Sequence, residues 1–154
     1  MAEKRMKICL AASSGGHLTQ LLKVKDVWQG YEVFCVSSAA IVREKLERFG
    51  RTYIVNECNR KHPVKSLRVL FQCLSISVKE RPSVVISTGA APGILMCLTA
   101  RLFSAKIVWL DSIANTERLS MSGRMVRPFA GLMLSQWPDV AAKYKDVEYA
   151  GAVI

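Results

Sequence analysis

The chain has 154 residues, of which 51% are hydrophobic and 22% charged, and its formal net charge is +10. This length suits a single domain over residues 1–154 with a sizeable core, and we find neither a signal peptide nor an apolar run long enough to span a bilayer. The positive charge indicates an acidic partner, and nucleic acid, anionic lipid headgroups and phosphorylated substrates all qualify.

The cysteines indicate a reducing compartment. They are odd in number and scattered, mostly along apolar runs. They form no C-x-x-C pair, and no histidine lies at metal-ligand spacing from them. We therefore expect free thiols in a cytosolic protein and no metal site. The five are Cys9, Cys35, Cys58, Cys73 and Cys97.

The first informative segment is a glycine turn between an apolar run at 8–11 and a predicted helix at 18–28. Gly15 and Gly16 carry no Cβ, so a phosphate can approach the backbone at the positive end of the helix dipole. His17 follows directly and exchanges a proton near neutral pH. The alternative is an ordinary tight turn, with His17 as a cap or a solvated side chain.

The next elements alternate between strand and helix patterns. Segments 31–37 and 52–55 are predicted strands, and the helical spacing of Ile41, Val42 and Leu46 predicts a helix between them. Such alternation is typical of a parallel α/β sheet.

A longer helix is predicted at 64–79, and its polar residues form one narrow stripe. Most of the remaining positions are apolar, which is typical of a well-buried crossover helix. Basic residues outnumber acidic ones around it, which favours contact with an anionic membrane surface instead. Both interpretations stay open on the sequence. The stripe consists of Lys65, Arg68, Gln72, Ser75 and Lys79.

A second glycine turn follows the apolar strand predicted at 83–87. The turn spans Thr88 to Gly93 and precedes a helix that we expect to begin at Pro92 or Gly93. Two turns of this kind, each at the carboxyl end of a strand, favour a phosphate or diphosphate ligand, since ligands bind at that edge of an open α/β sheet.

The strand predicted at 106–110 brings Asp111 and Ser112 to the same edge. The Asp111 carboxylate has three candidate roles: a general base, an acceptor for a sugar hydroxyl, or a cap for the following loop. That loop, 113–124, is long and polar, as functional loops often are. A last full strand is predicted at 132–135.

Five segments together resemble one known family. It is the oligosaccharide-biosynthesis family that comprises the membrane-recruiting half of the eukaryotic dolichol-linked N-acetylglucosamine transferase and its bacterial exopolysaccharide and capsule counterparts. The resemblance runs in order through nearly the whole chain, and its Gly-Gly-His, Ser-Gly-Arg and Gln-Trp-Pro elements are specific in combination. The segments are 13–21, 87–93, 110–112, 118–124 and 135–138.

The resemblance implies a GT-B glycosyltransferase split into two polypeptides, of which this chain is the acceptor-side half. The fold would be a Rossmann-like parallel sheet with helices on both faces, like the amino-terminal half of a GT-B enzyme. A polyprenyl-diphosphate-linked acceptor would bind at the two glycine turns, and His17 and Asp111 would be the catalytic candidates. The expected substrate-binding residues are Ser14, Gly15, Gly16, Thr88, Gly89, Gly93, Ser112, Arg118 and Ser120.

A second protein would then carry most of the nucleotide-sugar site. No dinucleotide cofactor is expected, because Glu32 lies before the end of its strand, where it cannot serve as the ribose-binding acid. The alternative is a non-catalytic scaffold that recruits the catalytic subunit to the membrane. The hypothesis of a nucleic-acid-binding module has only the positive charge in its favour, so we expect no nucleic-acid partner.

The chain departs from the family in two ways. Many relatives carry Glu at the position of Asp111, which weakens a direct catalytic role for this shorter side chain. Eukaryotic members usually begin with a membrane-spanning helix, which we do not find here. We therefore expect peripheral attachment at the cytoplasmic face of a membrane, through the helix at 64–79 or neighbouring apolar surface.

Overall fold

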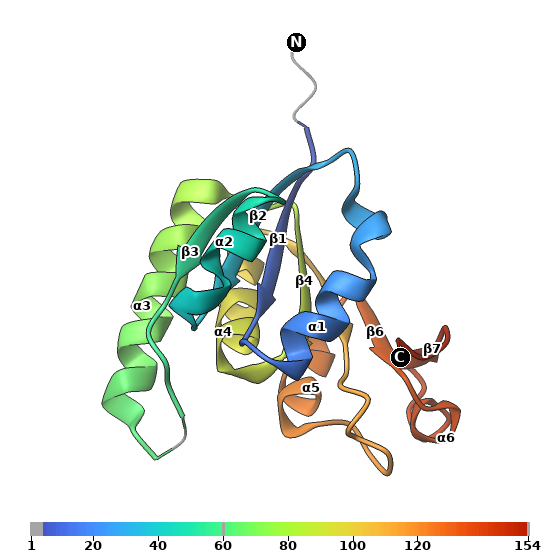
Figure 1. Cartoon of the computed structure of the whole chain (residues 1–154). Helices are drawn as coiled ribbons and strands as arrows, with labels where there is room; N and C mark the ends of the chain where they lie inside the picture. The colour runs from blue at the N-terminus through green and yellow to red at the C-terminus, as the bar shows by residue number, and fades with distance from the viewer. Residues whose placement is uncertain (1–4, 60, 154) are drawn as a thin grey trace.

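The computed structural model describes residues 5–59 and 61–153 as one parallel sheet with helices packed on it (Figure 1). The strands follow the order β3-β2-β1-β4-β5-β6-β7, and each pairs in parallel with its neighbours. All their carboxyl ends therefore lie at one edge of the sheet. The strands are β1 (Lys7–Ala12), β2 (Glu32–Ser37), β3 (Arg51–Ile54), β4 (Val84–Gly89), β5 (Lys106–Leu110), β6 (Leu132–Ser135) and β7 (Glu148–Tyr149).

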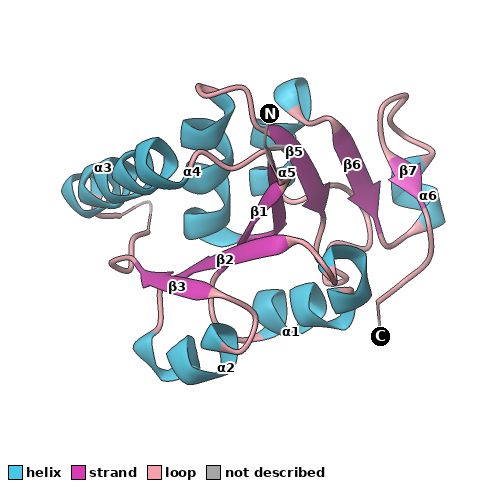
Figure 2. Cartoon of the chain, turned by 90° about the horizontal axis from the view of Figure 1, so that it is seen from above, coloured by secondary structure: helices cyan, strands magenta, loops and turns pink. Residues whose placement is uncertain are grey.

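The helices cover both faces of the sheet. Figure 2 shows α1 and α2 on one face and α3, α4 and α5 on the other. The expected Rossmann-like parallel sheet with helices on both faces is confirmed. The α-helices are α1 (Gly16–Lys23), α2 (Arg43–Glu47), α3 (Pro63–Glu80), α4 (Ala90–Arg101), α5 (Met121–Val126) and α6 (Pro138–Ala141).

Two hydrophobic cores form because successive strand residues point to opposite faces. In β1, Cys9 and Ala11 join the core that contains residues of α3 and α4, whereas Ile8 and Leu10 join the core beneath α1. All five cysteines are free. Burial raises the pKa of Cys73 to about 12, which keeps this thiol protonated.

Three helix boundaries differ from the sequence prediction. The helix expected to include Ile41 and Val42 begins only at Arg43, after a 3-10 turn at Ala40–Val42. The helix expected over 18–28 ends at Lys23, and a separate 3-10 turn follows at Lys25–Trp28. Helix α4 begins at Ala90 rather than at Pro92 or Gly93. Proline is tolerated there because backbone N–H groups in the first helical turn lack an intrahelical partner, so the missing donor costs nothing.

Helix α3 is buried along one face, through Val69, Cys73 and Ile76, and keeps apolar side chains exposed on the other. Phe71 is 61% exposed and Val64 80%. The interpretation as a well-buried crossover helix is therefore wrong, because the helix has only one layer to pack against. No helix in the described parts of the chain combines the length and the apolar composition needed to cross a bilayer.

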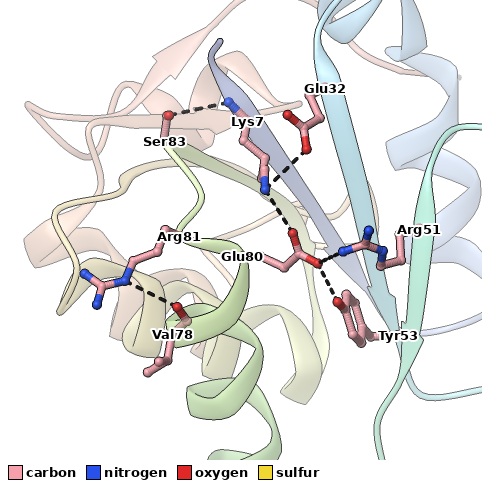
Figure 3. Close-up of polar contacts among 8 residues, drawn as sticks. All are labelled: Lys7, Glu32, Arg51, Tyr53, Val78, Glu80, Arg81 and Ser83. Atoms are coloured by element: carbon pink, nitrogen blue, oxygen red, sulfur yellow. Dashed lines mark hydrogen bonds and ion pairs between the residues drawn. The ribbon is translucent and has the colours of Figure 1, made fainter. Parts of the chain in front are cut away.

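The carboxyl end of α3 is fixed to the amino edge of the sheet by Glu80 (Figure 3). Its buried carboxylate lies 3.1 Å from Lys7 Nζ and 2.7 Å from an Arg51 guanidinium nitrogen, and it accepts a hydrogen bond from the Tyr53 hydroxyl. Burial by itself would raise the pKa of Glu80, but the hydrogen bonds from Tyr53, Lys7 and Arg51 outweigh it and hold the pKa at about 2.

Candidate functional site

The two glycine turns meet at the topological switch point of the sheet. From β1 the chain proceeds outward to β2 and β3, and then returns to the other side of β1 as β4. The turn at Gly15 follows β1 and the turn at Gly89 follows β4, so both lie at the carboxyl edge of neighbouring strands. In open α/β sheets this crevice is the usual ligand site.

His17 and Thr88 join the two turns by a reciprocal pair of hydrogen bonds. His17 Nδ1 lies 2.9 Å from the Thr88 carbonyl oxygen, and the Thr88 hydroxyl donates to the His17 carbonyl oxygen at 2.6 Å. A carbonyl oxygen can only accept, so Nδ1 must carry a hydrogen. In the neutral ring Nε2 is then the unprotonated nitrogen, and the half-buried imidazole can accept a proton there.

Gly89 makes room for that imidazole. A Cβ at this position would lie 2.7 Å from His17 Cε1, and the backbone φ of +132° is one that side-chain-bearing residues rarely adopt. Gly93 serves packing instead, because a Cβ there would lie 2.2 Å from Ser87 Oγ. Gly89 therefore shapes the His17 site, while Gly93 is buried and holds α4 close to β4.

The amino-terminal ends of α1 and α4 carry no side-chain cap within the described residues. Gly15 and Gly16 are exposed, and a Cβ on either would meet nothing within 4 Å. The amino end of α1, where the helix dipole is positive, is therefore exposed and has no side-chain cap among the described residues. Such an end favours an anionic group such as a phosphate.

Asp111 lies in a closed hydrogen-bonded cluster. It is 2% exposed, and its carboxylate accepts hydrogen bonds from Trp109 Nε1 at 3.0 Å, Ser120 N at 2.7 Å and Ser120 Oγ at 2.5 Å. Ser120 Oγ in turn accepts a hydrogen bond from Gly123 N at 2.8 Å and so caps α5. Of the three candidate roles for Asp111, this arrangement favours the loop cap.

Two buried glutamines strengthen the same edge and were not identified from the sequence. Gln136 Nε2 donates to Gln20 Oε1 at 2.5 Å and to the Asp111 carbonyl oxygen at 2.9 Å, while Gln136 Oε1 accepts from Val153 N at 2.8 Å. Gln136 belongs to the Gln-Trp-Pro element, which is its only sequence signal. Gln20 lies in the family segment 13–21, but that segment does not indicate its partner, which is 116 residues away.

The remaining candidates occupy separate positions. Ser14 lines a polar cavity of about 300 Å³ together with Ser13, Ser38 and Lys65. Ser112 Oγ accepts a hydrogen bond from Ala114 N at 3.3 Å and so supports its own loop. Arg118 is exposed in that loop.

Among solved structures, the fold is similar to the crystal structure of Acinetobacter baumannii MurG, with a TM-score of 0.76 and 16% sequence identity over 94% of this chain and 45% of that one. The expected likeness to the amino-terminal half of GT-B glycosyltransferases is thereby confirmed.

Curated relatives agree with one another in name. The UDP-N-acetylglucosamine transferase subunit ALG14 of Yarrowia lipolytica is 28% identical over 92% of this chain and 66% of the relative. The protein of the same name from Eremothecium gossypii is 25% identical over 97% of this chain and 60% of the relative. The chain thus spans less than two thirds of the length of these relatives. Residues 31–153 match the family model described as "Oligosaccharide biosynthesis protein Alg14 like", and the chain belongs to that family.

Proposed function

We propose that this chain is the acceptor-side subunit of a two-component glycosyltransferase. The enzyme transfers a sugar from a nucleotide donor to a polyprenyl-diphosphate-linked acceptor in cell-surface polysaccharide or oligosaccharide synthesis. One observation carries the proposal: the pairing of His17 with Thr88 between two helix ends whose amides suit a diphosphate. The names of the curated relatives, which are transferase subunits, support it.

In this proposal the acceptor diphosphate binds at the amino ends of α1 and α4, with Ser14, Gly15 and Gly16 alongside. His17 Nε2 takes the proton of the acceptor hydroxyl as that oxygen bonds to C1 of the donor sugar. The bond between C1 and the nucleoside diphosphate breaks, and the diphosphate leaves with the bonding electrons. General base catalysis of this kind typically contributes about 10²- to 10⁴-fold in rate.

Asp111 acts in this scheme by positioning. Its carboxylate is occupied by Trp109 and Ser120, so the energetically cheapest role is to hold the loop that carries Ser112 and Arg118 toward the substrate. Because Asp111 is 2% exposed, the surrounding loop would have to move before its carboxylate could take a proton from a substrate. A direct catalytic role for Asp111 stays a prediction from the sequence.

A donor-binding subunit completes the site. The proposal treats residues 1–154 as one acceptor-side half domain, with the reaction in the cleft between the two proteins. The cationic charge of the chain suits both diphosphates of the reaction. In this proposal the donor-binding partner determines which sugar is transferred.

Peripheral attachment to the cytoplasmic face of a membrane belongs to the same proposal. Val64, Leu67 and Phe71 are exposed on the first turns of α3, beside the exposed bases Lys65 and Arg68. Apolar side chains that enter the interface and cations that meet anionic headgroups are the two signals of interfacial helices. A lipid-linked acceptor would then reach the site from the bilayer.

The test is transfer by the chain reconstituted with its donor-binding partner, using UDP-N-acetylglucosamine and a polyprenyl-diphosphate-linked sugar. His17→Gln should lower kcat by about 10²-fold or more while the unfolding midpoint stays nearly unchanged. His62→Gln is the matched control, because His62 is the other histidine of the chain and is exposed before α3. A His17→Gln pair with full activity would favour the scaffold alternative, and a chain that binds no partner would overturn the proposal.

A further inference from the structure

An apolar groove of about 400 Å³ lies between α4, α5 and the start of α3. Its walls come from three segments that are distant in the sequence, and Met125 at its rim is 51% exposed. Volumes of this size are typical of small-molecule sites. Its lining includes Ile94, Leu95, Leu98, Met121, Met125 and Ser66.

The groove adjoins the polar cavity that contains Ser14. Cys58, Asn59 and Ala91 line both spaces, so the two lie side by side. The polar cavity presents the hydroxyls of Ser13, Ser14 and Ser38, the Lys65 ammonium group and one acid, Glu57. A ligand that fills both spaces must be an amphiphile with a polar head and an apolar chain.

We propose that the groove binds the first isoprene units of the acceptor's lipid, next to its diphosphate in the polar cavity. This inference rests on the proposed function and extends it by assigning residues to the lipid rather than to the sugar or the diphosphate. Met121 and Met125 suit such a ligand, since unbranched thioether side chains adapt to a flexible hydrocarbon.

The chemistry of the two spaces supports a lipid with an anionic head as the occupant. The groove offers the apolar side chains of Ile94, Leu95, Leu98, Met121 and Met125, and the adjoining cavity offers the Lys65 cation to a diphosphate. Binding there would remove the first isoprene units from water, which is favourable.

The experiment compares binding of farnesyl diphosphate and inorganic diphosphate to the full chain by calorimetry. Met125→Asp should weaken the binding of farnesyl diphosphate about tenfold and leave the binding of inorganic diphosphate unchanged, because the new charge lies against the hydrocarbon only. Leu102→Asp is the control, since Leu102 follows α4, is 74% exposed and lies outside the groove. The Met125 side chain is itself exposed, so its replacement should leave folding intact.

Three other outcomes are decisive. Equal affinity of wild type and Met125→Asp for farnesyl diphosphate, with inorganic diphosphate still bound, overturns the groove assignment and leaves the proposed function standing. If Leu102→Asp loses as much affinity for farnesyl diphosphate as Met125→Asp does, the groove assignment is also overturned, because the effect of the added charge would not depend on the groove. If neither diphosphate binds the wild-type chain, the diphosphate site fails and the proposed function fails with it.

Discussion

Glu80 at the amino edge of the sheet and the glycine turn after β1 at the carboxyl edge differ in how their polar groups are satisfied. At the amino edge, Glu80 is buried and its carboxylate is shared among Lys7, Arg51 and Tyr53. At the carboxyl edge, Gly15 and Gly16 are exposed and no side chain among the described residues caps α1. Closed polar groups stabilise the scaffold, and open ones remain available for a ligand.

The carboxyl edge itself contains both kinds. The amino end of α5 is closed, since Ser120 caps it and Asp111 holds Ser120. The amino ends of α1 and α4 have no side-chain cap among the described residues. His17 and Asp111 are equally good catalytic candidates in the sequence. In the structure only Asp111 has its side chain enclosed in a buried hydrogen-bonded cluster, and substitutions can test this difference.

The largest effect on stability should come from Glu80→Gln. The Glu80 pKa is about 2 instead of the usual 4.5, so the folded state prefers the ionised carboxylate. The contribution of this group is present above about pH 4.5 and is lost as the pH falls toward 2. At neutral pH the substitution should cost about 3 kcal/mol, and chemical denaturation at several pH values measures it.

Glu47→Gln serves as the control for Glu80. Glu47 is an exposed partner of Arg43 at 3.7 Å, and such surface pairs contribute only about 0.5 kcal/mol. If the two variants lose equal stability, or if the acid dependence of unfolding persists in Glu80→Gln, then the amino edge is less closed than its hydrogen bonds indicate.

A smaller loss, about 2 kcal/mol, is expected for Asp111→Asn. The amide keeps one acceptor oxygen but turns an N–H₂ group toward donors, so part of the buried cluster loses its partner. Unfolding measures this loss, and kcat of the reconstituted pair should fall much less than in His17→Gln. Asp139→Asn, at an exposed position in α6, is the control. A fall in kcat as large as that of His17→Gln would restore a catalytic role for Asp111.

The smallest effect concerns α3, whose first turns lie at the open carboxyl edge. Phe71→Asp should weaken binding to phosphatidylserine-containing vesicles about tenfold, which is ~1.4 kcal/mol. Ile41→Asp is the control, because Ile41 is 90% exposed outside α3. Vesicle sedimentation at low and high salt measures the apolar and the electrostatic contributions to binding. Equal binding by Phe71→Asp and wild type would contradict a membrane contact through α3.

Local patterns in the sequence were sufficient for most of the elements and for the placement of both glycine turns at one edge of the sheet. Alternating apolar runs predicted the strands, and glycine with small residues after two of them predicted the turns at Gly15 and Gly89. These features follow from short-range geometry, because side-chain period and backbone freedom are properties of a few consecutive residues. Family motifs added the likeness to a GT-B half.

Tertiary structure alone decided which groups are open and which are closed. His17 and Thr88 are 71 residues apart and meet only because β4 lies next to β1. From the sequence, Asp111 is as good a catalytic candidate as His17. Only the structure shows that its carboxylate accepts hydrogen bonds from Trp109 and Ser120. The apolar groove likewise needs three segments to converge. Partners of a side chain depend on strand order and helix packing, and these long-range relations leave no pattern in a single sequence.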